Sequence, residues 1–183
     1  MSASSTVSPA GAQVSVATPG SLWGFALKFG IAAFALILAF DLVRGNAVEQ
    51  RLFAAGVLAP AALLATWLDP AHPTAVSNRR LTSARAVLNV TRGCEGSETL
   101  SLFAAAVLAF PSRWRRRLVV LGTGALLIYA LSVVRLGALA WVLGRHRDVF
   151  DAIHGVIAPL APLAIVSVHF SVWAARTRVL SPP

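Results

Sequence analysis

The segment Leu118–Leu143, LVVLGTGALLIYALSVVRLGALAWVL, is the longest apolar stretch of the chain and contains one charged residue, Arg135. An α-helix rises 1.5 Å per residue, so crossing about 30 Å of hydrocarbon takes roughly twenty apolar residues. This segment is long enough, and it therefore predicts a membrane-spanning helix.

The composition of the whole chain points to a bilayer as well. Of its 183 residues 57% are hydrophobic and only 13% are charged, whereas soluble domains have about 25% charged residues. The net charge of +9 would suggest nucleic acid in a soluble protein. Here the basic residues fall mostly between apolar segments, where they set topology and meet anionic lipid headgroups. We therefore expect membrane lipid, and no nucleic acid, as a partner.

Five apolar segments predict an all-α fold, a polytopic membrane helical bundle of about five transmembrane helices. The third segment is adequate only if its helix begins near Cys94. All five tryptophans lie at or next to segment ends, where interfacial tryptophans belong: Trp23, Trp67, Trp114, Trp141 and Trp173. The predicted spans are roughly 22–40, 52–68, 94–111, 118–143 and 153–174.

The parts outside these spans are predicted as follows. Residues 1–20 carry no charged side chain, so they lack the basic region of a signal peptide and are expected to be a disordered tail. Residues 69–93 form an outward-facing loop. Within it the stretch 75–90 mixes arginines with apolar residues, which suits an interfacial amphipathic helix or an ordinary solvated loop. Residues 176–183 form a basic cytoplasmic tail.

Orientation rests on the turn Arg113-Trp114-Arg115-Arg116-Arg117. Four arginines in a short connection favour the cytoplasmic side. With this turn inside, alternation along the chain places the turn that holds Arg44 and Arg51 inside as well. The N-terminal tail is then outside, and so is the loop 69–93.

Three residues with suitable chemistry converge in this topology. Cys94 lies at the outer end of the third span and His154 at the outer start of the fifth. Arg135 is eight residues before Leu143, roughly 12 Å below the outer end of its helix. A thiol, a guanidinium and an imidazole are the parts of a nucleophilic acyl-transfer site. Because consecutive spans alternate, the three stay together even if the whole protein is inverted.

Cys94 lies between Gly93 and Gly96, where a polar loop meets an apolar segment. In the first turn of a helix the positive end of the dipole favours the thiolate, while Glu95 and Glu98 oppose it. The alternative is a small apolar filler. With a single cysteine, an internal disulfide and a multi-cysteine metal site are excluded. We expect no metal and no cofactor.

Arg135 and His154 also have two interpretations each. Arg135 is either a fixed positive charge for a developing oxyanion or a snorkelling interfacial arginine. Ser132, one turn earlier, could hydrogen-bond to it. His154 is either a general acid and base or an interfacial group, and Asp151 one turn earlier could orient its ring.

The order Gly93-Cys94-Glu95-Gly96, an arginine deep in the next long span and a histidine opening the last one resembles the exosortase/archaeosortase family, in a compact form. The resemblance covers about residues 90–160. It implies a bacterial inner-membrane enzyme whose site faces the periplasm or exterior. It further implies recognition and cleavage of a C-terminal sorting signal, made of a short motif, a transmembrane helix and a basic tail, on exported proteins.

Carried over residue by residue, the resemblance makes Cys94 the nucleophile, Arg135 the oxyanion or substrate contact, and His154 the general acid and base. The chain departs from the family in two ways. Many members have more spans, and Ser132 stands where an asparagine is usual. A different class stays open: a non-catalytic membrane scaffold or subunit of a polysaccharide export or envelope assembly system.

Overall fold

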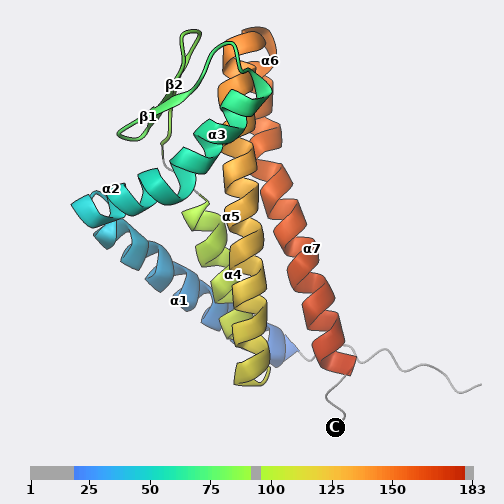
Figure 1. The fold of residues 1–183 in the computed structure, drawn as a ribbon. Helices are drawn as coiled ribbons and strands as arrows, with labels where there is room; N and C mark the ends of the chain where they lie inside the picture. Colours follow the sequence, from blue (N-terminus) through green and yellow to red (C-terminus); the bar gives the residue numbers. More distant parts are fainter. Residues whose placement is uncertain (1–18, 92–95, 180–183) are drawn as a thin grey trace, which may run out of the picture.

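The computed structural model describes residues 19–91 and 96–179, and these form a helical bundle (Figure 1). This confirms the predicted all-α fold. Three helices are continuous or nearly so along their length: α1 (Pro19–Val43), α4 (Ser97–Ala109) and α5 (Trp114–Arg145). Two further helical stretches each contain a π-helical segment. The first consists of α2 (Ala47–Phe53), η1 (Ala54–Leu58) and α3 (Ala59–Leu68), and the second of α6 (Arg147–Ala152), η2 (Ile153–Ile157) and α7 (Ala158–Val179).

Four helical stretches are long and apolar enough to cross a membrane: Leu22–Val43, Ala47–Leu68, Trp114–Arg145 and Arg147–Thr177. Many of their large apolar side chains are exposed on the outside of the bundle, as expected for helices that face lipid. The third predicted span is shorter than expected. Helix α4 has 13 residues, which rise about 20 Å, less than the roughly 30 Å of the hydrocarbon core.

The direction of α1 corrects the predicted topology. Arg44, at the end of α1, donates a hydrogen bond of 3.1 Å to Ser97 Oγ, where α4 begins. The two helices are therefore antiparallel, and Figure 1 shows the turn between α1 and α2 partway up the bundle. The prediction that this turn lies at the same end as Arg113–Arg117 is wrong. Asp41, 3.2 Å from Arg44, and Ser97 hold this arginine beside the start of α4.

The stretch 75–90 forms neither an amphipathic helix nor a plain loop. It folds into an antiparallel sheet of β1 (Ala75–Ser77), β2 (Arg80–Thr82) and β3 (Val87–Asn89), with β2 in the middle. In its register Val76 pairs with Leu81, and Leu81 pairs with Leu88. One row of apolar side chains thus lies on one face, which is the period-two pattern of a half-buried sheet.

The sheet covers one end of the bundle (Figure 1). Its buried leucines pack against α3, α5 and the start of α7 in one cluster: Leu58, Ala61, Ala62, Leu81, Leu88, Val90, Leu136, Leu139 and Ala158. Gly137 lets α5 approach α3 closely, because a Cβ there would lie 3.0 Å from the carbonyl oxygen of Ala61. Small residues at such contacts are typical of helices that pack within a membrane.

Asp69, a buried residue directly after α3, is the centre of a network of charged and polar side chains at the end of the bundle that carries the sheet. Arg145 donates two hydrogen bonds to its carboxylate, of 3.1 and 3.3 Å. This hydrogen-bonded guanidinium, together with His72, lowers the pKa of Asp69 to about 2. Arg85 Nε lies 3.2 Å from His72 Nε2. Because arginine only donates, Nε2 is the acceptor and Nδ1 carries the proton that faces Asp69.

Asp69→Asn is expected to lower the thermal unfolding temperature of the detergent-solubilised protein at pH 7. The pKa of Asp69 is lower in the folded protein than its ordinary value of 3.8, so its ionised form stabilises the fold fully above that value. This contribution declines as the pH falls toward 2. The difference between wild type and variant should therefore shrink from pH 4 to pH 2. The exposed Asp148→Asn is the matched control, and a difference that does not change with pH contradicts the assignment.

Candidate functional site

The nucleophile candidate Cys94 and its neighbour Gly93 fall in residues 92–95, outside the part of the chain that the structure describes. The description resumes at Gly96, which caps the start of α4 with a φ of +83°. A Cβ built at Gly96 would collide with Ser132 Oγ and lie 3.5 Å from Ile128 Cγ2. Both the backbone angle and the close contact require glycine, so the chain entering α4 lies directly against α5.

Ser132 has a role beyond the one predicted. Its buried hydroxyl donates a 2.8 Å hydrogen bond to the carbonyl of Ile128, one turn back on α5. Because this hydroxyl is the donor here, its oxygen can still accept from a guanidinium, and a hydrogen bond from Arg135 stays a prediction. Ser132 is also a small residue on the face of α5 that receives Gly96.

Arg135 lies one turn further along α5, and its Nε is buried. It lines a cavity of about 200 Å³ between α5 and the last helical stretch. Ile153 and Ile157, on either side of His154 in the sequence, line the same cavity. Arg135 therefore faces the segment that carries the candidate histidine.

His154 belongs to the π-helical turn η2, and such turns inside helices often mark functional sites. Its ring stacks on Phe150, with 5.2 Å between centroids and an interplanar angle of 6°. Its Nδ1 is buried and has no hydrogen-bond partner among the described residues. Asp151 is exposed, and in the described chain no hydrogen bond or ion pair joins it to His154. The ring is thus oriented by Phe150 and not, as predicted, by Asp151.

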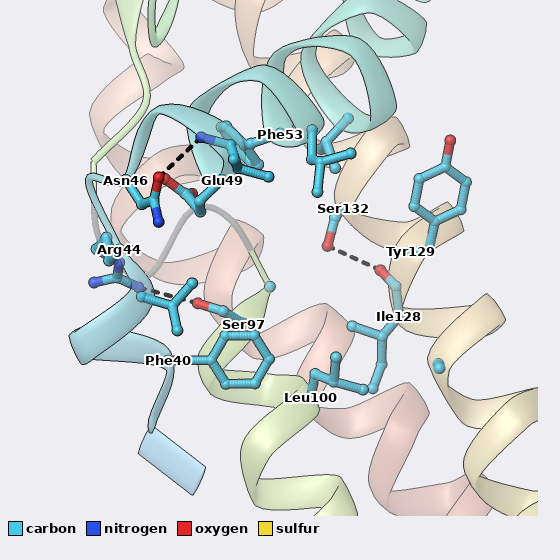
Figure 2. A pocket seen from close by; sticks show the side chains of 16 residues that line it. Phe40, Arg44, Asn46, Glu49, Phe53, Ser97, Leu100, Ile128, Tyr129 and Ser132 are labelled. Carbon is cyan, nitrogen blue, oxygen red and sulfur yellow. Dashed lines mark hydrogen bonds between the residues drawn. The ribbon is translucent and has the colours of Figure 1, made fainter. Parts of the chain in front are cut away.

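Gly96 and Ser132 both border a larger cavity, of about 580 Å³, and Figure 2 shows the side chains that line it. The end of α1, helix α2 with η1, the first turn of α4 and the middle of α5 form its wall. Most of the wall is apolar, and the polar side chains that border it are Arg44, Asn46, Glu49, Ser97, Tyr129 and Ser132. This cavity could not be predicted from the sequence, because it requires the turn after α1 to lie beside α4.

Tyr129 fixes one side of this cavity. Its hydroxyl donates a 2.8 Å hydrogen bond to the carbonyl of Gly56, which belongs to the π-helical segment η1. A π-helical turn interrupts the usual helical hydrogen bonds, and in a membrane each freed carbonyl needs a partner. The bond thus joins α5 to the second span at the level of the cavity.

Ser132→Cys is expected to form a disulfide with Cys94 under mild oxidation, since Cys94 is the only natural cysteine. One residue, Glu95, separates Cys94 from Gly96, and Gly96 lies against Ser132. Ala130→Cys, exposed on the same helix, is the matched control and should stay reduced. The cross-link is measured as protection from alkylation on a non-reducing gel. Equal protection in both variants would show that the pairing is not specific.

The candidate residues therefore form two groups along α5. Gly96 contacts Ser132, while Arg135 faces the segment of His154 across a separate cavity. The start of α4 and the segment of His154 are far apart in the sequence, and both pack against α5. Comparisons with protein-family models, with curated proteins and with solved structures find no match for this chain.

Proposed function

We propose that this chain is a membrane-embedded cysteine peptidase or transpeptidase of the exosortase/archaeosortase type. It cleaves a C-terminal sorting signal of exported proteins at the outer side of the bacterial inner membrane. Cys94 is the nucleophile, Arg135 contacts the oxyanion, and His154 is the general acid and base. The contact between Gly96 and Ser132 carries the proposal, because it joins the cysteine segment to the helix of Arg135.

Chain connectivity supports a short path from Cys94 to α5. Two residues of extended chain span at most about 7 Å, so Cys94 cannot be far from Gly96. Gly96 in turn lies against Ser132, and Arg135 is three residues further, a rise of about 4.5 Å along the helix. This short path supports a mechanism in which the Cys94 thiol and the Arg135 guanidinium act on one substrate carbonyl.

The environment of Arg135 supports its role. Its Nε is buried, in a cavity wall whose other side chains are apolar, and ionisable residues within membrane spans are rare and commonly functional. In low-dielectric surroundings a fixed guanidinium stabilises developing negative charge more strongly than it does in water. This favours the oxyanion role over the snorkelling interpretation.

His154 supports the acid–base role in a similar way. An unpaired buried polar atom costs about 1–3 kcal/mol, and Nδ1 of His154 is such an atom within the described chain. Stacking on Phe150 holds the ring in one orientation. A ring that is held in place and keeps one nitrogen unused is suited to exchange a proton with a reacting group.

The proposed reaction has two steps. The Cys94 thiolate attacks the scissile carbonyl carbon, and a C–S bond forms as the C–N bond breaks. The departing amine takes its proton from His154, which holds the proton that the thiol released. The resulting thioester then reacts with water, which gives a free carboxylate, or with an amine acceptor, which gives a new amide. Either reaction restores the thiol.

The test is to detect the thioester. Membranes that contain the tagged chain are solubilised without reductant, and adducts on Cys94 are sought as a mass increase that neutral hydroxylamine removes. The proposal predicts a hydroxylamine-sensitive adduct in the wild type, and a smaller amount of it in His154→Ala, which lacks the proton donor for the leaving amine. Cys94→Ala should lack it. Finding no adduct in either cysteine-containing protein, in cells that export proteins with C-terminal membrane helices, would contradict the proposed chemistry.

A further inference from the structure

At the end of the bundle away from the sheet, α5 and α7 border an open cavity of about 300 Å³. Its lining combines three basic side chains with an apolar floor: Arg115, Arg116, Val119, Trp173, Arg176 and Thr177. The volume is at the lower end for cavities that hold small ligands. The candidate site described above uses none of these residues.

The three arginines of this cavity are available to a ligand. Within the described chain the side chains of Arg115, Arg116 and Arg176 make no hydrogen bond or ion pair, and the cavity wall contains no carboxylate. Arg117 differs, because it donates a 2.9 Å hydrogen bond to the carbonyl of Phe110. Arg117 therefore holds the turn between α4 and α5, whereas its neighbours present unneutralised charge. Guanidinium groups bind phosphate through paired hydrogen bonds.

The floor of the cavity is apolar and rigid. Trp173 packs against Phe110 and Phe170, with ring centroids 5.2 and 5.7 Å apart, and Val119 lies beside it in the cavity wall. Thr177 does not offer its hydroxyl proton, since it donates to the carbonyl of Trp173 at 2.9 Å. A free phosphate ion would make no favourable contact with this apolar floor. An acyl-bearing ligand would cover it.

We propose that this cavity binds the headgroup of an anionic phospholipid. The phosphate lies among Arg115, Arg116 and Arg176, and the glycerol and first acyl carbons cover Val119 and Trp173. Basic pockets between helices at a membrane surface are suited to such headgroups, and the interfacial Trp173 is at the matching depth. This site is independent of the proposed peptidase activity.

The test uses the purified full-length chain in detergent, titrated with phosphatidylglycerol and with phosphatidylcholine and read by native mass spectrometry. Wild type should bind phosphatidylglycerol about tenfold or more tightly than phosphatidylcholine, and Arg116→Gln with Arg176→Gln should remove that preference. Arg113→Gln is the matched control, because Arg113 is exposed in the same turn and does not line the cavity. It should keep the preference.

Three results would overturn the proposal. One is an equal loss in Arg113→Gln, which would mean general charge attraction. Another is competition by inorganic phosphate at the same concentration as the lipid, which would mean a site for a free anion. If the double variant fails to fold, the wild-type comparison decides alone, and no preference for phosphatidylglycerol over phosphatidylcholine overturns the proposal.

Discussion

Cells that carry Cys94→Ala in place of the wild-type chain are expected to accumulate uncut precursors of exported proteins. In a serine protease, loss of the nucleophile lowers kcat by a factor on the order of a million. An acyl-transfer reaction without its nucleophile should likewise be undetectable. The measurement is mass spectrometry of the C-terminal fragments of membrane-anchored proteins, compared between wild-type and variant cells.

The control for this result is Ser171→Ala, a change of one polar atom on exposed α7, where the hydroxyl only bonds its own helix. It should process normally, and both variants should be present in the membrane at wild-type amounts. Normal processing by Cys94→Ala would remove the peptidase proposal. It would leave the non-catalytic scaffold, in which Arg135 variants impair assembly and Cys94 is silent.

Arg135→Lys is expected to reduce processing by about two to three orders of magnitude, the usual cost of losing an oxyanion donor. Lysine keeps the charge but does not reproduce the planar fork of the guanidinium. The same fragment assay measures this effect. Processing at wild-type rates would mean that Arg135 acts only through its charge or only in packing.

Gly96→Ala is expected to be the most destabilising single substitution near the site. A left-handed backbone costs an L-residue about 1–2 kcal/mol, and Gly96 has a φ of +83°. The collision with Ser132 Oγ adds overpacking, typically about 1–3 kcal/mol. The free energy of unfolding in detergent, measured by denaturant titration, should fall accordingly.

A double-mutant cycle separates the two causes. Ser132→Ala removes the colliding oxygen, so Gly96→Ala should cost less in that background, while the backbone strain remains. The coupling energy is expected to be about 1–3 kcal/mol. Gly122→Ala on α5 is the control, since a Cβ there meets nothing within 4 Å, and it should not destabilise. A coupling near zero would contradict the contact between Gly96 and Ser132.

Helix content and the position of the apolar segments follow from the sequence because both depend on local hydrophobicity and length. The orientation of α1 does not. The charge of Arg44 suggested that the turn after α1 lies at a membrane surface. In the structure Arg44 pairs with Asp41 and donates a hydrogen bond to Ser97. The contact with Ser97 joins segments that are distant in sequence, so local patterns do not indicate it. The stretch 75–90 was also missed. Its mixture of arginines and apolar residues predicted an amphipathic helix or a solvated loop, whereas each strand carries one apolar side chain between its neighbours, Val76 in β1 and Leu81 in β2.

In the candidate site, too, some residues are indicated by the sequence and others only by the packing of distant segments. Arg135 stood out because a charge within a long apolar segment is costly, and the structure places it in a cavity wall with the neighbours of His154. The function of Gly96 as the contact to Ser132 could not be predicted, because nothing local indicates which helix the loop meets. Phe150 was missed for a related reason. It stacks on His154 through the geometry of a π-helical turn, which apolar patterns do not indicate.

The most direct test of the central claim is the pH dependence of Cys94 alkylation in intact cells by a membrane-impermeant reagent. If Cys94 is an activated nucleophile that faces outward, labelling is fast and its pH midpoint lies well below the free-thiol pKa of about 8.5. The midpoint should change in His154→Ala. Labelling only after permeabilisation would show that Cys94 faces the cytoplasm, opposite to the proposed orientation. No labelling in either state, with the chain shown to be expressed, would contradict an activated outward-facing nucleophile.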